Sequence, residues 1–544
     1  MNAIELSLFS SRIESICDEM GAALKRSAFS PNIKDRLDFS CAIFDARGQL
    51  TAQAAHIPVH LGSMAYAMEY IIAEVEWQAG DMVVVNDPFK GGTHLPDVTV
   101  IAPLFVEGRL LAFVANRAHH ANIGATAPGS MPVSRTLQEE GIVIPPTHLL
   151  RAGVWCNAVL EQLAGLAPGT LQSTEAACAE AQGGEPPLGA HTLAAMGDFT
   201  AQVSANRTGL SRLQELVTRY GQARYQKMVA ALNEYAARVA ADSLRQIPDG
   251  CYEFADQLDD DGAGTRDIAI RARIEVMDGQ VAVDFSGTSQ QVPGNVNCPL
   301  SVAAAAVFYV FRCLMPARIP ACAGAFRGVT LRAEAGSLLN ARYPAAVAAG
   351  NVETSTRVVD VVIGALAQAI PRRLAAASHG SMNNVAMGAI RADGSRWDYY
   401  ETMGGGMGAY ASGAGLSAVQ THMTNTLNTP VESLELHYPL QVNRYQIRRG
   451  SGGAGQHRGG DGLLRELCFK QPATVSLLTE RRTSQPWGWA GGSAGQRGEN
   501  RLNGVPLAAK TTFEVVPGDV LAIATPGGGG WGPPTEESPK QGIR

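Results

Sequence analysis

Residues 97–119 read DVTVIAPLFVEGRLLAFVANRAH, and this stretch decides how the first part of the chain folds. Two apolar runs of strand length, Val98 to Val106 and Leu110 to Ala115, flank a Glu-Gly pair at 107–108. Apolar runs joined by a short Gly-containing turn predict an antiparallel β-hairpin. A turn at 107–108 makes the numbers of paired residues sum to about 215.

Acidic and imidazole side chains should meet at the open end of this hairpin. The expected register puts Asp97 opposite Ala118 and next to His119, and opposed residues lie ~4.5–5.5 Å apart. His94 precedes Asp97 by three residues, and the bend at Pro96 lets it fold back over the same end. Two imidazoles and a carboxylate suit a divalent transition metal such as Zn²⁺, Mn²⁺ or Fe²⁺. The alternative is that the histidines bond backbone groups and Asp97 caps a turn.

Other polar residues cluster around this candidate metal site. His120 should point to the other side of its strand, where it either carries a proton or packs. We take His120 and Asp38 as candidate catalytic residues. Two downstream runs rich in side-chain donors, 351–355 and 421–430, fit either a substrate pocket or hydrogen-bonded loops, and they supply three candidate substrate-binding residues: Glu353, His422 and Asn425.

The remaining pattern predicts a mixed α+β, multidomain chain. Apolar residues step by three or four from Leu6 to Leu24, which indicates a helix, while segments 39–53 and 268–285 read as hairpins. Buried helices are expected at 302–313 and 358–370, and the last ~95 residues are rich in strands and turns. Helices and antiparallel hairpins thus come in blocks, with a β-rich C-terminal part. We expect an N-terminal metal-site domain (1–205), a central α+β domain (206–450) and a β-rich C-terminal domain (451–544).

Composition excludes several classes of function. Hydrophobic residues make up 46% of the 544 residues and charged residues 17%, with a net charge of −6 and no basic block. A folded chain with this balance is not expected to bind nucleic acid or an anionic membrane. No apolar stretch is long enough to span a bilayer, and we expect no secretory signal. Nine cysteines without a CxxC pair read as reduced thiols of a cytoplasmic protein.

Glycine is unusually frequent, at 59 residues, and concentrates in tracts such as 404–406, 452–453, 459–460 and 527–530. These tracts predict tight turns and close backbone approaches. No Walker pattern and no GxSxG elbow occur, so ATP binding by this chain alone and serine-nucleophile chemistry are both disfavoured.

Several segments together resemble the hydantoinase B/oxoprolinase family. They include Ser30 to Arg36, His56 to Met64, Gly91 to Asp97, Ala349 to Ser355 and His422 to Thr426, and the likeness extends over nearly the whole chain. The resemblance implies a subunit of ATP-dependent hydantoinases, oxoprolinases or lactam hydrolases. A separate hydantoinase A-type ATPase subunit would activate the carbonyl oxygen of a cyclic amide with ATP, and this chain would complete ring opening at its metal in a hetero-oligomer.

The resemblance also implies a ligand set. Metal-containing family members have ligands at the positions of His94, Asp97 and His119, plus a carboxylate at the position of Asp35. Asp35 stands where many members have Glu, which shortens its reach by one methylene. Asn122 stands where many have Asp, which removes a charge near the site.

Two alternatives to an amidohydrolase stay open. The same scaffold serves ketone carboxylases of the acetone or acetophenone type, where bicarbonate is a substrate. The other alternative is a non-catalytic assembly subunit whose histidines are structural.

Overall fold

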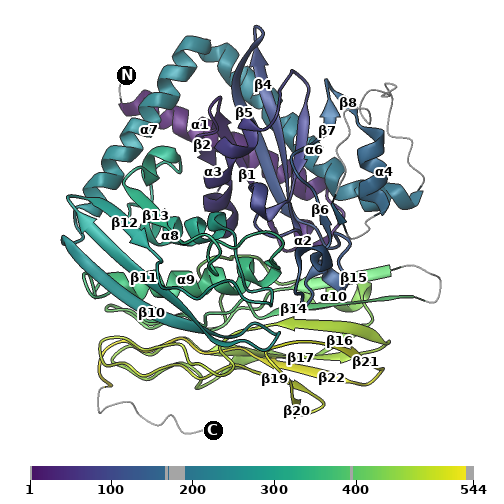
Figure 1. Ribbon diagram of the computed structural model, residues 1–544, viewed down its shortest axis with the longest axis vertical. Coiled ribbons are helices and arrows are strands. Elements are labelled where there is room, and N and C mark those ends of the chain that lie inside the picture. Colours follow the sequence, from purple (N-terminus) through teal and green to yellow (C-terminus); the bar gives the residue numbers. More distant parts are fainter. Residues whose placement is uncertain (1–2, 55, 166–168, 171–189, 392–395, 535–544) are drawn as a thin grey trace.

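The computed structural model describes residues 3–54, 56–165, 169–170, 190–391 and 396–534. It confirms the expected mixture of helices and antiparallel sheets (Figure 1). None of the helices in these ranges combines the length and apolar character that a bilayer-spanning segment needs. Seven described cysteines are free, but Cys156 is disulfide-bonded, so the expectation of thiols throughout is wrong at that position.

A seven-stranded sheet forms the N-terminal part. Its strand order is β2 (Leu50–Gln53), β1 (Phe39–Asp45), β5 (Arg109–His119), β4 (Asp97–Val106), β3 (Met82–Val85), β7 (Thr147–Arg151) and β8 (Val154–Trp155). The predicted hairpins at 39–53 and around 107–108 are both present. All neighbouring strands in this sheet run antiparallel.

Helices cover both faces of this sheet, and its central strands are therefore buried on both sides. Val98 and Val100 belong to a core cluster with α1 (Ala3–Ser27), α6 (Ala190–Tyr220) and α7 (Gln222–Leu244). On the other face Ile101 and Phe113 pack with Met64 and Met68 of α3 (Pro58–Ala73). Side chains alternate along a strand, so odd-numbered residues of β4, Asp97 included, face the α3 side.

The central part packs against α3. Helix α8 (Leu300–Cys313) contacts α3 and α9 (Ser355–Leu366), and α9 lies on β10 and β11. Both buried helices were expected. The sheet beneath them has the order β10 (Gly250–Asp260), β11 (Arg266–Met277), β12 (Gln280–Asp284) and β13 (Val329–Arg332), with the expected Asp278-Gly279 turn between β11 and β12.

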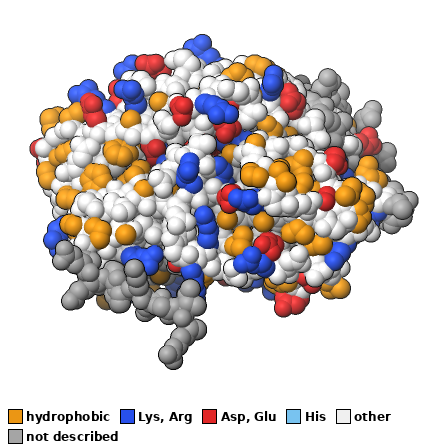
Figure 2. Space-filling view, turned by 90° about the horizontal axis from the view of Figure 1, so that it is seen from below, with side chains coloured by type: hydrophobic (Ala, Val, Ile, Leu, Met, Phe, Trp, Pro, Cys, Tyr) orange, Lys and Arg blue, Asp and Glu red, His pale blue; other side chains and the backbone are white. Residues whose placement is uncertain are grey.

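Two face-to-face sheets form the lower layer of Figure 1 and share one core, which contains Val475 and Leu521. One sheet has the order β15 (Arg396–Glu401), β14 (Asn384–Ile390), β18 (Ala473–Leu478) and β21 (Lys510–Val515). The other has the order β16 (Leu440–Arg448), β17 (Gly462–Phe469), β22 (Val520–Ala524), β19 (Glu499–Leu502) and β20 (Val505–Pro506). Seen from below, Lys and Arg side chains gather in a band through the middle of this face (Figure 2).

Short elements complete the described fold. They are α2 (Pro31–Lys34), α4 (Asn157–Gly165), α10 (Val431–His437), the parallel pair β6 (Ile142–Val143) and β9 (Gly169–Thr170), four 3₁₀ turns at Pro88–Lys90, Pro128–Ser130, Leu137–Glu140 and Ala323–Phe326, and a π-helical turn at Gly350–Thr354. The domain boundaries stay predictions. Helix α6 runs through the first one, and the β14–β18 pair joins strands from either side of the second.

The glycine tracts meet backbone to backbone. Gly460 N–H donates to Met407 O at 2.8 Å, and Gly528 N–H donates to Gly460 O at 2.9 Å. A Cβ on Gly406 would lie 1.9 Å from the Gly460 carbonyl oxygen. The expected close approaches are therefore present, and they exclude side chains at these positions.

Candidate metal centre

Asp97 lies directly opposite His119 on the paired strands β4 and β5. The sequence-based register, which put Ala118 opposite, is wrong by one residue, because a bulge between Leu104 and Phe105 shifts the pairing. Directly opposed residues share one face of the sheet, so the correction brings the carboxylate and the imidazole closer than expected. Asp97 Oδ1 is 3.2 Å from His119 Nδ1.

His94 approaches the same carboxylate oxygen from the loop before β4. Its Nε2 lies 3.1 Å from Asp97 Oδ1, and its Nδ1 is 3.2 Å from the carbonyl oxygen of Ala348. His94, Asp97 and His119 are all buried, and each offers one ligand atom within 4.8 Å of the others. The hairpin prediction that these three residues converge is therefore correct.

Three further side chains fix the Asp97 carboxylate through Oδ2. Thr93 Oγ1 donates at 2.7 Å, Asn351 Nδ2 donates at 3.2 Å, and His60 Nε2 lies 3.2 Å away. Burial alone would raise the pKa of Asp97, but the facing histidines, His94 and His60 first, hold it well below its usual range. Asp97 is therefore ionised, as a metal ligand must be.

Sequence reasoning missed His60 and Asn351 as contributors. His60 belongs to a histidine-rich run, but only helix α3, which was not predicted, turns it toward Asp97. Asn351 lies in the π-helical turn that precedes α9. Such a turn is often found at functional sites, yet the residues 350–354 carry no sequence pattern that predicts it.

The ring of Tyr400 packs against the ring of His119. The two rings stack at 4.7 Å with an angle of 14° between their planes. Alternation along β15 sends Tyr399 into the core of the lower sheets and Tyr400 to the opposite face. The guanidinium of Arg36, buried beside Asp38, lies 5.1 Å from the Tyr400 ring centre and donates to the Tyr400 carbonyl oxygen at 2.9 Å.

The donor set fits a divalent transition metal. Among the described residues, His119 Nε2 is buried without a hydrogen-bond partner, whereas the buried His94 Nε2 faces the Asp97 carboxylate at 3.1 Å. A buried nitrogen without a partner, such as His119 Nε2, is costly in a protein interior unless something binds it. Burial lowers the pKa of His119, which favours the neutral form of its ring. Burial also disfavours charge on His94, but Asp97 outweighs it, and the pKa of His94 is raised.

The other predicted residues lie around this group or outside it. Asp38 is buried next to it, where its backbone carbonyl accepts from His119 N–H at 3.0 Å. Asp35 is half-buried at the end of α2, and the structure does not bring it into the group of ligand atoms. His120 faces α6, where Nε2 is 2.9 Å from Gln202 Oε1 and the ring packs on Phe199. His120 therefore lies on the other side of the sheet from His119, as its strand position requires.

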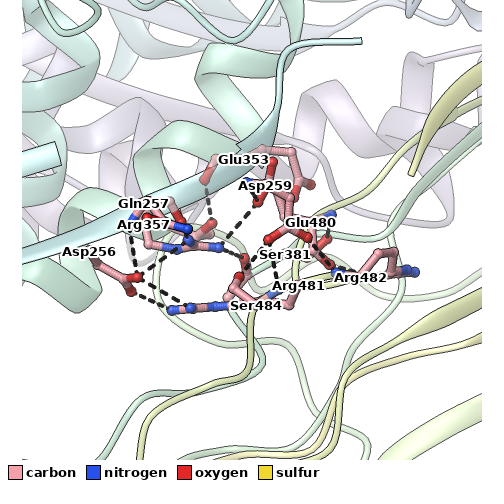
Figure 3. A network of polar contacts seen from close by, with 12 residues as sticks. Asp256, Gln257, Asp259, Glu353, Arg357, Ser381, Glu480, Arg481, Arg482 and Ser484 are labelled. Atoms are coloured by element: carbon pink, nitrogen blue, oxygen red, sulfur yellow. Dashed lines mark hydrogen bonds and ion pairs between the residues drawn. The ribbon is translucent and has the colours of Figure 1, made fainter. Parts of the chain in front are cut away.

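The structure separates the three candidate substrate-binding residues. His422 Nε2 is 3.6 Å from Asp360 Oδ1, and Asn425 is exposed, with Nδ2 donating to the His56 carbonyl oxygen. Glu353 instead belongs to a buried network of charged residues (Figure 3), where Oε1 accepts from Asn384 Nδ2 at 2.7 Å. Tyr400 O–H donates to the same Asn384, so this amide joins the network to the ring beneath His119.

Charges in the network of Figure 3 are paired across distant segments. Glu480 contacts Arg357 at 3.3 Å and Lys510 at 2.6 Å, and Arg481 contacts Asp256 at 2.6 Å. Burial, followed by the nearby Glu480 carboxylate, raises the pKa of Glu353 to about 7. Such networks tie the central sheet to the lower layer, and each member depends on the others.

Comparison with known families now places the chain. Residues 2–534 match the family described as Hydantoinase B/oxoprolinase. The chain belongs to the hydantoinase B/oxoprolinase family. Its sequence is 38% identical to 5-oxoprolinase 1 of Arabidopsis thaliana over 98% of this chain and 42% of the plant protein. It is also 36% identical to an uncharacterized protein of Methanocaldococcus jannaschii, over 98% of this chain and 92% of the archaeal one.

Solved structures of two proteins are similar to this hydantoinase B/oxoprolinase chain. One is the ATP-dependent caprolactamase from Pseudomonas jessenii, with a TM-score of 0.87 and 26% identity over 98% of this chain and 91% of that one. The other is a nucleotide-free acetone carboxylase, with a TM-score of 0.82 and 18% identity over 98% and 76% of the chains, which shows the shared fold. The chain spans about two fifths of the length of the oxoprolinase it matches.

Proposed function

We propose that this chain is the ring-opening subunit of an ATP-dependent cyclic amide hydrolase, with a metal held by His94, Asp97 and His119. The observation that carries the proposal is the convergence of two buried imidazoles on one ionised carboxylate, with His119 Nε2 left without a partner. The named oxoprolinase and caprolactamase relatives support a cyclic amide such as a hydantoin, 5-oxoproline or a lactam as substrate. A separate hydantoinase A-type subunit would bind ATP and activate the amide.

The residues of the chain have distinct parts in this proposal. A divalent cation bound here would supply Lewis-acid polarisation of a carbonyl and acidify a water molecule. Thr93, His60 and Asn351 hold the Asp97 carboxylate in one orientation. Tyr400 fixes the plane of the His119 ring and covers one side of it, which excludes water there.

Elemental analysis of the purified chain tests the metal assignment. We expect about one Zn, Mn or Fe per chain in the wild type, and loss of it in His94→Ala and His119→Ala. His148→Ala is the matched control, because His148 also lies beside a buried carboxylate, Asp81, at 3.4 Å, but outside the group. Wild-type protein without metal, still folded, would favour a non-catalytic assembly subunit.

Assays with the A-type subunit test the reaction. Release of ADP and phosphate should accompany ring opening of a cyclic amide, and neither should proceed without the other. Ring opening without ATP would refute the coupling. Product formation that requires bicarbonate would identify a ketone carboxylase instead.

A further inference from the structure

A cavity of about 510 Å³ opens in the lower layer, away from the histidines. Three arginines from separate segments line it: Arg448 at the end of β16, Arg482 after β18, and Arg497 before β19. Glu499 is the one carboxylate among its lining residues, and Glu499 pairs with Arg501. The cavity lining is therefore strongly positive, in the layer where Figure 2 shows the basic band.

The arginines are held by neutral oxygens. Arg448 Nη1 donates to the carbonyl oxygens of Arg497 and Thr525, at 2.7 and 3.2 Å, and Arg497 Nη1 donates to that of Thr483 at 3.2 Å. Within the described part of the chain, Nε and Nη2 of Arg448 and of Arg497 make no hydrogen bond. In each arginine, Nε and Nη2 form the edge of the guanidinium that can donate two parallel hydrogen bonds to two oxygens of an anion.

Arg482 also lines the cavity, and hydrogen bonds to neutral oxygens hold its guanidinium in place. Its Nη1 donates to Asn383 Oδ1 at 2.8 Å and to the Glu480 carbonyl oxygen, and its Nε and Nη2 both reach Asn500 Oδ1. Burial lowers the pKa of Arg482 to about 10; the nearby carboxylates of Glu353, Asp259 and Glu480 oppose this shift, and Arg448 adds to it. None of these three carboxylates lines the cavity, where Glu499 is the acidic group near Arg448.

We propose that this cavity binds the phosphate group of a small molecule through the free guanidinium edges of Arg448 and Arg497. Two bidentate edges match the several oxygens and double charge of a phosphate, whereas a carboxylate offers two oxygens and occupies one edge. The volume suits a ligand of small-molecule size. The source is either free inorganic phosphate or the phosphate of a nucleotide.

Calorimetric titration of the full chain with inorganic phosphate, ADP and acetate, after removal of metal with a chelator, tests this site. We expect phosphate or ADP to bind with a Kd below about 1 mM and acetate at least ~10-fold more weakly. ADP binding ~10-fold tighter than phosphate would identify a nucleotide site, and equal binding would identify a site for phosphate alone.

Variants locate the binding. The double variant Arg448→Gln with Arg497→Gln should weaken binding at least ~10-fold, and Arg448→Lys should weaken it because charge stays but the bidentate edge is lost. Arg501→Gln is the control, since Arg501 does not line the cavity and is already paired. The proposal is overturned by equal binding of acetate and phosphate, by wild-type affinity in the double variant, or by no binding at ~10 mM phosphate.

Discussion

Asp97 Oδ1 lies 3.2 Å from His119 Nδ1 and 3.1 Å from His94 Nε2, so one carboxylate oxygen stands between two imidazoles. The bulge in β5, where Leu111 is the extra residue, creates this arrangement by moving His119 opposite Asp97. Asp97 is the central residue of the candidate metal site, because both imidazole rings face its carboxylate.

Asp97→Asn should therefore abolish metal binding in a folded protein. The amide keeps the shape of the side chain but loses the negative charge that a divalent cation needs. We expect metal content to fall at least ~10-fold by elemental analysis. The matched control is Asp81→Asn, a buried carboxylate of the same domain that faces His148. Full metal content in Asp97→Asn would contradict the ligand assignment.

Tyr400 should act on metal binding through its ring, separately from its hydroxyl. Tyr400→Leu removes the ring stacked on His119, and we expect ~10-fold weaker metal affinity in a chelator competition. Tyr400→Phe keeps the stack and leaves Asn384 Oδ1 without its donor, at a cost of about 1–3 kcal/mol in the free energy of unfolding. Equal metal affinity in the two variants would show that the stack has no part in holding the site.

The stability of the wild type should fall as the pH rises from about 4.5 to about 7 through the contribution of Glu353. Its folded-state pKa of about 7 is above the ordinary value of 4.5, so the folded state binds the proton more tightly and loses that advantage on ionisation. Glu353→Gln should match the wild type near pH 5 and be more stable near pH 8, by up to about 3 kcal/mol in denaturant unfolding.

Glu480→Gln provides the opposite control for that pH series. It removes the partner of the buried Lys510 and Arg357, so it should destabilise the protein at pH 8 as well. A gain in stability at pH 8 in both variants would mean that the network is not held by its ion pairs.

Gly406→Ala should destabilise the lower layer strongly. The new Cβ would lie 1.9 Å from Gly460 O and 2.3 Å from Gly528 N, and backbone on both sides cannot move aside cheaply. We expect a loss of about 3 kcal/mol or a fall of several degrees in Tm. Gly165→Ala is the control, because a Cβ there meets nothing within 4 Å. An unchanged Tm in Gly406→Ala would mean that the tracts are loosely packed.

Local patterns predicted the parts of this fold that depend on neighbours in sequence. The hairpins at 97–119 and 266–284 follow from apolar runs joined by turns, and α8 and α9 follow from apolar runs of helix length. The register beyond the bulge did not follow, because an extra residue in one strand has no signature in an apolar run. The glycine tracts predicted close backbone approaches. The sequence did not show which tracts meet, because the partners come from distant segments.

The residues of the candidate site also divide into those that local sequence predicts and those that only tertiary packing brings to the site. Asp97 and His119 lie on one hairpin and His94 lies in the loop just before it, so spacing and strand geometry were enough to bring them together. His60, Asn351 and Tyr400 reach the site from separate elements, and only tertiary packing decides which of their neighbours faces inward. Asp35 was carried over from family resemblance alone, and its role as a ligand stays a prediction.

The aromatic platform under His119 comes from a strand far downstream of the hairpin that bears the histidine. While the chain is being synthesised, the early hairpin can emerge and pair well before its supporting ring exists. Under the proposed metal assignment, capture of a cation in its final geometry would wait for the lower layer to dock, and metal loading would be a late event of maturation.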